Sequence, residues 1–188
     1  MDLPRRSRSL LLRLLVAYLL PTLALIGVFG WLVHRVAASA LEGSLGRRLV
    51  GIAQAAAVQL RPSSLGFLSP GDDASRTARR LRHKLTLLER RTRVARLMVL
   101  DRELRSKVDT RGALRIGEHY YHADADRSEL GRVFSGEEAS SVLFVGADGR
   151  TYKTGYAPVL DDSGQVVAAV AVEGSAEFFT VLDSLRTW

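Results

Sequence analysis

The chain has 188 residues and no cysteine, which excludes a disulfide framework, thiol catalysis and thiolate metal sites. Its formal net charge is +7 and its isoelectric point about 10.3, values that would suit a nucleic-acid-binding protein. The basic residues are concentrated in a short N-terminal arm and in one helical segment, however, and acids outnumber bases from residue 97 onward. We therefore expect no nucleic-acid partner.

An uninterrupted apolar segment lies near the N-terminus. Residues 14–33 carry no charged side chain, and about twenty helical residues span roughly 30 Å, the thickness of a bilayer's hydrocarbon core. The sequence thus predicts one transmembrane helix at 14–33, between a basic arm (1–13) and a domain on one side of the membrane (34–188). A cleaved signal peptide is the alternative, because residues 38–40 resemble a cleavage site. The length of the apolar segment favours a retained anchor.

The distribution of positive charge predicts the orientation of this anchor. Several arginines precede the span in the arm against a single acid, whereas only His34 and Arg35 flank its other end. Basic residues close to a span tend to stay in the cytoplasm. We therefore expect a cytoplasmic N-terminus and a domain outside the cytoplasm.

The helical pattern continues beyond the span to about residue 60, and residues 34–95 form a helical part of the domain. Apolar residues recur in this first helix at spacings of three and four: Leu41, Leu45, Leu49, Ile52, Ala56 and Leu60. Such a stripe suits packing on the chain's own sheet and also the seam of a parallel homodimer, which we expect. After a loop, Asp72 or Asp73 is predicted to cap a second helix that ends near residue 95.

This second helix carries most of the basic charge of the domain. Between residues 76 and 96 many arginines face the single acid Glu89. The arginines would lie close to anionic lipid headgroups, or they would form a solvated face with their stems packed along the helix. We favour the solvated face.

Residues 96–175 show the pattern of a β-sheet. Strands are predicted at 97–100, 103–109, 141–146, 151–160 and 166–173, with a short helix at 124–134. Asp148-Gly149 is typical of a two-residue hairpin turn with positive φ at both positions. The last strand is almost wholly apolar, so we expect it at the centre of the sheet.

These elements predict an α+β fold in which a transmembrane helix continues into a long helix. An antiparallel sheet of about five strands follows, with helices mainly on one face. Residues 176–188 would form an exit helix that leads toward a second span.

The sequence contains no catalytic constellation. It lacks a nucleophile elbow and a phosphate-binding loop, so no enzyme activity, no ATP binding and no cofactor are expected, and an anchored hydrolase is disfavoured. His119 and His122, followed by Asp124 and Asp126, have the residue types of a metal site. At this spacing in a polar loop a structural role is favoured, and no metal is predicted.

The candidate ligand site lies on the penultimate strand. Side chains alternate along a strand, so Tyr152, Thr154 and Tyr156 share one face and can line a small polar pocket. His119 and Tyr121, in a glycine-containing loop, are expected to close over them. The alternative is that these aromatic side chains merely cover the sheet.

The segment 152–175 carries a family resemblance. A strand ending in Ala157-Pro158-Val159, an acidic turn closed by Gly164, an apolar strand and then Gly174-Ser175 resembles the PDC/Cache-type extracytoplasmic sensor domain. Such domains occur in bacterial sensor histidine kinases, chemoreceptors and membrane diguanylate cyclases. In the citrate and dicarboxylate sensors a basic residue four positions before this proline helps to hold the carboxylate. Thr154 occupies that position here, so a carboxylate ligand is not implied.

The resemblance implies the ligand-sensing input module of a membrane receptor, with a sensor histidine kinase of a two-component system as the expected output. The chain would lie in the bacterial inner membrane, with its main domain periplasmic or extracellular. In the family the exit helix continues into a second span, a HAMP linker and a catalytic module, which would follow Trp188. A stand-alone anchored binding or scaffold protein is the alternative.

Overall fold

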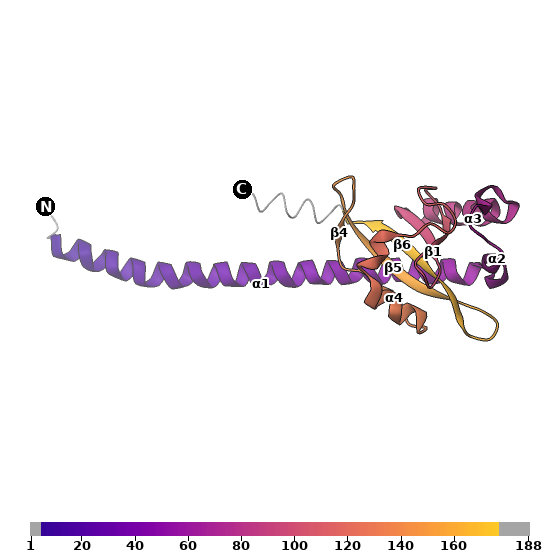
Figure 1. Ribbon diagram of the computed structural model, residues 1–188. Coiled ribbons are helices and arrows are strands. Elements are labelled where there is room, and N and C mark those ends of the chain that lie inside the picture. Colours follow the sequence, from indigo (N-terminus) through magenta and orange to yellow (C-terminus); the bar gives the residue numbers. More distant parts are fainter. Residues whose placement is uncertain (1–4, 177–188) are drawn as a thin grey trace. The chain divides into compact units, whose positions relative to one another are not determined.

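The computed structural model describes residues 5–176, with side-chain detail from residue 15. The chain divides into two compact units, the first ending at Leu41 and the second beginning at Glu42, and helix α1 (Arg5–Gln59) contributes to both (Figure 1). The long helix predicted from the sequence is therefore confirmed. The predicted exit helix at 176–188 lies outside the described residues apart from its first residue.

The first unit is the N-terminal part of α1. Within the described residues, one helix is long and apolar enough to cross a membrane, and it is this one. Large apolar side chains such as Leu20, Phe29 and Trp31 are exposed along it. The guanidinium of Arg35 lies 5.2 Å from the centre of the Trp31 ring. Trp and Arg side chains at the end of an apolar helix are typical of a membrane–water interface.

The second unit contains the C-terminal part of α1 and all later elements. They are α2 (Pro62–Gly66), the 3₁₀ turn η1 (Asp72–Ala74), α3 (Arg76–Thr92), β1 (Arg96–Leu100), β2 (Ser106–Asp109), the 3₁₀ turn η2 (Tyr121–Asp124), α4 (Arg127–Phe134), β3 (Ala139–Ser140), β4 (Phe144–Val145), β5 (Thr151–Leu160) and β6 (Val166–Ser175).

The strands form one antiparallel, six-stranded sheet in the order β2-β1-β6-β5-β3, with β4 also paired to β5. The apolar strand β6 lies between β1 and β5, as its composition predicted. Of the predicted strand at 141–146 only Phe144–Val145 forms a strand, β4, while the short strand β3 lies before it at Ala139–Ser140. Ser141 Oγ accepts a hydrogen bond from the backbone N–H of Thr154 (2.9 Å), so a side chain replaces the regular ladder where the pairing is interrupted.

The two faces of the sheet have separate cores. Leu97, Val99, Val170 and Val172 point to the face covered by the C-terminal part of α1 together with α2 and α3. Alternate residues of β1 and β6, among them Met98, Leu100 and Ala171, point to the opposite face, where η2 and α4 pack. Tyr156 of β5 belongs to this second core. The predicted α+β class is thus confirmed, with most of the helical cover on the α1 face (Figure 1).

The apolar stripe of α1 is part of the first core. Leu49, Ala53, Ala56 and Leu60 are buried against the sheet and α3, and Leu45 and Ile52 pack at the margin of the same core. From Leu45 onward the residues proposed for a homodimer seam are therefore occupied within one chain, whereas Leu41 at the start of the stripe is exposed. A helix with a three-four stripe needs an apolar partner surface, and the chain's own sheet provides it.

Two local predictions require correction. Ser75 caps α3, because its side chain accepts a hydrogen bond from the N–H of Ala78 (3.1 Å), whereas Asp72 and Asp73 begin the separate turn η1. At the β4–β5 hairpin only Gly149 has positive φ (76°). The N–H groups of Gly146 and Gly149 donate to the carbonyls of Arg150 and Gly146, respectively. This pattern is a type I turn followed by a left-handed glycine rather than a two-residue loop.

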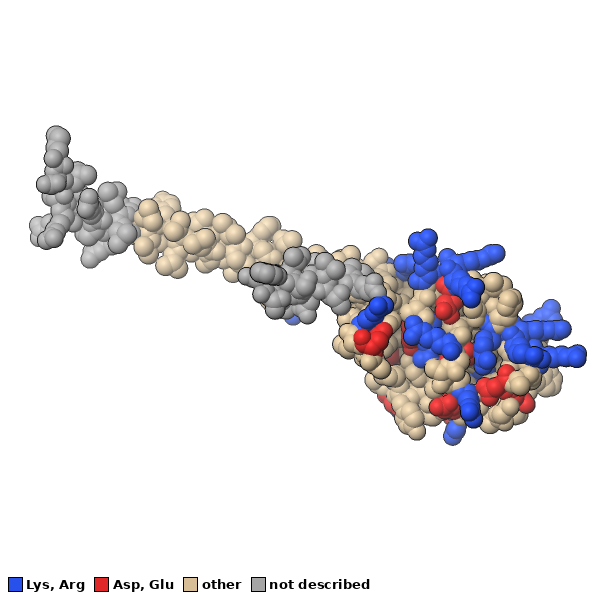
Figure 2. Space-filling view, turned by 90° about the horizontal axis from the view of Figure 1, so that it is seen from above, with Lys and Arg blue, Asp and Glu red and all other residues tan. Residues whose placement is uncertain are grey.

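Helix α3 presents its basic residues to solvent. Ala78, Leu81 and Leu85 are buried against the sheet, as the spacing predicted, while the arginines lie on the exposed faces. Figure 2 shows basic side chains outnumbering acidic ones on the surface seen from above. Arg82 and Lys84 contact Asp73 and the carbonyl of Gln59, respectively, which ties the helix to its neighbours.

Candidate functional site

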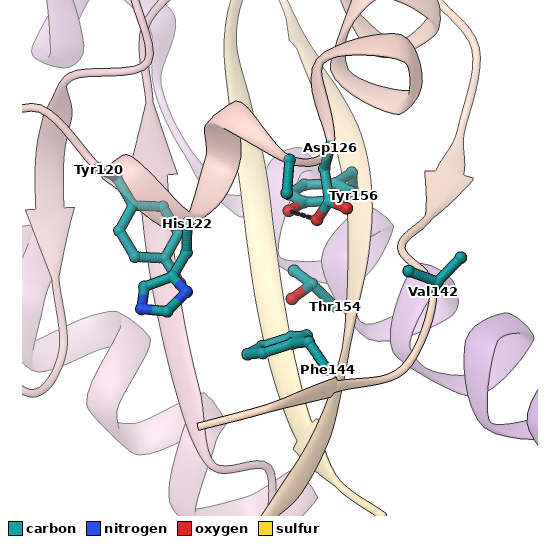
Figure 3. A pocket seen from close by; sticks show the side chains of 8 residues that line it. Tyr120, His122, Asp126, Val142, Phe144, Thr154 and Tyr156 are labelled. Carbon is teal, nitrogen blue, oxygen red and sulfur yellow. Dashed lines mark hydrogen bonds between the residues drawn. The ribbon is translucent and has the colours of Figure 1, made fainter. Parts of the chain in front are cut away.

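A cavity of about 70 Å³ lies on the face of the sheet opposite α1 (Figure 3). The turn η2 bounds one side, β4 another, and β5 forms its floor. We call it the η2–β5 cavity. Its lining residues are Tyr120, His122, Ala125, Asp126, Val142, Phe144, Thr154 and Tyr156.

The loop from β2 to α4 positions one wall of this cavity. Tyr120 is extended (φ −94°, ψ 91°). Its N–H donates to the carbonyl of Leu104, which holds the loop beside the segment that leads into β2. The following turn η2 places Ala123 fully in the core, so His122 is carried to the rim. Asp126 then directly precedes α4, with its N–H bonded to the carbonyl of Ala123.

The strongest polar contact of the cavity joins its floor to this wall. The hydroxyl of Tyr156 donates a 2.6 Å hydrogen bond to Oδ2 of Asp126, and both residues are buried. Burial raises the pKa of Asp126 above the ordinary aspartate value, even though Tyr156 stabilises its charged form. Burial, and then the neighbouring Asp126, raise the pKa of Tyr156, so this hydroxyl stays protonated and acts as a donor.

A buried ionic network lies beside the cavity. Tyr120 donates from its hydroxyl to Oε1 of Glu173 (2.5 Å), and Arg96 Nη1 lies 3.8 Å from the same oxygen. Arg96 also binds Asp109 through two hydrogen bonds, from Nε to Oδ1 (2.8 Å) and from Nη2 to Oδ2 (2.9 Å). Burial alone would raise the pKa of Asp109, but the Arg96 guanidinium and the backbone donors hold it below its ordinary value. Burial and Glu173 raise the pKa of Tyr120.

Aromatic rings follow one another along the open side of the site. The ring centres of Tyr120 and His122 are 5.7 Å apart, those of His122 and Phe144 6.0 Å, and those of Phe144 and Tyr152 6.1 Å. Figure 3 shows Tyr120 and His122 on one side of the cavity and Phe144 below Thr154. These rings give the site a largely apolar, π-rich wall.

The structure brings together only some of the residues predicted from the sequence. Thr154 and Tyr156 line the cavity, and Tyr152 lies on the same face of β5, as strand alternation predicted. Tyr152 is outside the lining, however, and its hydroxyl donates to Asp148 (2.6 Å), whose carboxylate raises the pKa of this phenol.

His119 and Tyr121 do not reach the cavity. His119 bonds through Nε2 to Asp124 (2.9 Å) and through Nδ1 to the carbonyl of Glu103 (3.2 Å), while Tyr121 is exposed and packs edge-on against His119. In an extended segment alternate side chains point to opposite sides. The prediction chose the outward-pointing pair of this segment, and Tyr120 and His122 form the inward-pointing pair.

Four further lining residues were missed by the sequence analysis: Ala125, Asp126, Val142 and Phe144. Asp126 was considered only for a metal, whereas the structure places its carboxylate at the cavity wall beside Tyr156. Phe144 and Val142 belong to a segment that was read as one regular strand. The arrangement offers a carboxylate, a threonine hydroxyl and aromatic rings to a guest molecule, which is the composition of a binding site.

No protein-family model matches this chain, and a comparison with characterised proteins finds no match. Solved structures do resemble it. The sensory domain of the Campylobacter jejuni chemoreceptor Tlp3 with isoleucine bound aligns with a TM-score of 0.50 and 8% identity, covering 77% of this chain and 56% of that chain.

Two further structures show a similar arrangement. The sensor domain of DcuS from E. coli aligns with a TM-score of 0.48 and 14% identity over 74% of this chain and 94% of that one. The sensor domain of the V. cholerae histidine kinase DctB aligns with a TM-score of 0.44 and 14% identity, covering 72% of this chain and 56% of that chain. This chain spans about half the length of the Tlp3 and DctB chains. The Tlp3 domain, at a TM-score of 0.50 and 8% identity, shows a likeness of the fold alone, and this fold agrees with the PDC/Cache-type sensor fold predicted from the sequence.

Proposed function

We propose that this chain is the ligand-sensing input module of a membrane receptor, with its site in the η2–β5 cavity. The observation that carries the proposal is the cavity itself, which combines buried polar groups with aromatic walls on a sensor-type fold. A binding domain joined to an apolar helix could transmit the presence of a ligand to the membrane. The ligand would be a small molecule, because the cavity has a volume of only about 70 Å³.

The output is proposed to be a sensor histidine kinase of a two-component system. This part of the proposal rests on the resemblance carried by the segment 152–175. A chemoreceptor output and a stand-alone anchored binding protein are the alternatives, and the reading frame that follows the codon for Trp188 in the gene distinguishes them. We also propose that the N-terminus is cytoplasmic and the sheet domain lies outside the bacterial inner membrane, from the arginine asymmetry around the span.

Signal transfer would use the packing of α1 on the opposite face of the sheet. Lys153 of β5 is buried and binds Glu42 of α1 (Nζ–Oε1 2.8 Å), and Gly155 lies directly against the α1 backbone at Leu49. Thr154 and Tyr156, neighbours of these residues on the same strand, face the cavity. A ligand that binds two arrangements of β5 with different affinity would therefore shift α1. The homodimer stays part of the proposal, with a seam other than the buried leucines.

The proposed site is tested by blocking the entrance of the cavity with a larger side chain. Val142 lines the cavity yet is 68% exposed, so Val142→Trp is expected to obstruct the cavity without entering the core. Val145, 66% exposed and outside the lining, provides the matched control Val145→Trp. In a thermal-shift screen of amino acids, carboxylates, amines and sugars on the purified full chain in detergent, we expect a ligand that stabilises the native protein and Val145→Trp but not Val142→Trp. A ligand that stabilises all three proteins equally binds elsewhere and contradicts the site.

A further inference from the structure

The charge of the η2–β5 cavity is negative. Its lining contains one carboxylate, Asp126, and no lysine or arginine. A second carboxylate, Glu173, is buried at the hydroxyl of Tyr120 outside the lining, and Arg96 balances its charge. A site for an organic anion would need a guanidinium or ammonium donor at its wall.

The buried bases nearest to the cavity are directed elsewhere. Arg96 engages both oxygens of Asp109 with two hydrogen bonds, and its guanidinium also lies 3.8 Å from Glu173 and 5.4 Å from the centre of the Tyr120 ring. Lys153 leaves the opposite face of β5 to pair with Glu42. Neither is among the lining residues. The carboxylate of Asp126 therefore has no basic partner among the contacts of residues 15–176, and it accepts a single hydrogen bond, from Tyr156 to Oδ2.

Aromatic rings surround the same space. Tyr120, His122 and Phe144 contribute rings to the lining, and the faces of such rings attract cations through their quadrupoles. A carboxylate combined with several rings is the arrangement that recognises alkylammonium groups, because the rings accept the methyl or methylene groups while the charge is balanced at one point.

We propose that the η2–β5 cavity selects small organic cations, with the carboxylate of Asp126 as the counter-ion and the neighbouring rings of His122 and Phe144 as the aromatic wall. This inference rests on the proposed function of the same cavity and adds the ligand class.

The energetic state of Asp126 agrees with this assignment. Its pKa is raised by burial in the ligand-free protein, so a negative charge at this position costs stability that a bound ammonium would return. The negative charge of Glu129 raises the pKa of Asp126 and the positive charge of Lys153 lowers it. His122 and Tyr156 face the same cavity. Asp126→Asn is therefore expected to keep the fold with an unfolding temperature at least as high as that of the native protein, since the amide oxygen still accepts from Tyr156.

Three probes with the same tert-butyl group and different charge test the proposal: tert-butylammonium, tert-butanol and pivalate. On the purified full chain at matched ionic strength, saturating tert-butylammonium is expected to raise the unfolding temperature by about 2–4 °C, whereas pivalate has no effect. Asp126→Asn is expected to abolish the shift. The exposed Asp148, whose carboxylate binds Tyr152 outside the cavity, provides the control Asp148→Asn, which should keep it.

The outcomes separate this inference from the proposed function. If pivalate or tert-butanol stabilises the protein more than the ammonium does, and Val142→Trp removes that effect, the cavity is a ligand site and the cation assignment is overturned. If none of the probes stabilises the protein, the cation assignment is overturned while the broader screen still decides the site. A shift by tert-butylammonium that survives in Asp126→Asn also overturns it.

Discussion

Replacing Asp109 by asparagine is expected to destabilise the sheet domain by about 3–5 kcal/mol, because it breaks a buried ion pair and leaves the Arg96 guanidinium with only the more distant carboxylate of Glu173. Asp109 is completely buried and accepts four hydrogen bonds, two from Arg96 and one each from the N–H groups of Arg111 and Leu114. Each oxygen accepts from one N–H of Arg96 and one backbone N–H, so an amide presents its NH₂ group to two of these donors. The buried guanidinium of Arg96 would then lose half of its bidentate contact and the nearer of the two carboxylates that balance its charge.

The effect is measured as the change in unfolding free energy in urea at neutral pH. The control is Asp124→Asn, which weakens the solvent-accessible contacts with Arg127 and His119 and is expected to cost much less than Asp109→Asn. Because the pKa of Asp109 is lowered in the folded state, its contribution is present above the unfolded aspartate pKa of about 3.9 and is lost as the pH falls through the folded value. The difference between Asp109→Asn and the native protein should therefore shrink in acid. Equal losses for the two variants would contradict the account.

Gly155→Ala is expected to destabilise the domain by about 2–3 kcal/mol through a clash between β5 and α1. A Cβ atom at this position would lie 2.5 Å from the backbone carbon of Leu49 and from the nitrogen of Val50. Neither backbone atom can move without displacing α1 from the sheet. The strand and the helix therefore touch at a point where only glycine fits.

Gly51→Ala is the matched control for this variant. Gly51 lies on the exposed side of α1 with nothing within 4 Å of an added Cβ, so alanine there should stabilise the helix by about 0.5–1 kcal/mol. Both variants are compared by urea unfolding. A neutral Gly155→Ala would mean that α1 is not held against β5, and the proposed route from the cavity to α1 would lose its contact.

Periodicity was sufficient to predict most of the fold. The apolar run of β6 predicted a central strand, because only a strand covered on both faces can carry valine and alanine at nearly every position. The stripe of Ala78, Leu81 and Leu85 likewise predicted the buried face of α3. The stripe of α1 was ambiguous, since the same spacing suits a dimer seam and an intrachain core, and only the tertiary contacts show that the core is formed.

The site was predicted only in part, for a local reason. Strand alternation placed Thr154 and Tyr156 correctly, because β5 is long and regular. The loop 111–126 has no such periodicity, and which alternate residues face inward depends on the pairing of Tyr120 with Leu104 and on the turn η2. Asp126 was not assigned to the ligand site because its hydrogen bond to Tyr156 joins residues 30 positions apart.

The central claim, that the η2–β5 cavity is the ligand site of this domain, is tested most directly by a crystal structure with a stabilising compound bound. The account predicts density for the compound within the cavity, in contact with Asp126, Thr154 and the ring of Phe144, and a retained hydrogen bond between Tyr156 and Asp126. Density on the α1 face of the sheet or on the basic surface of α3, with the cavity unchanged, would contradict it.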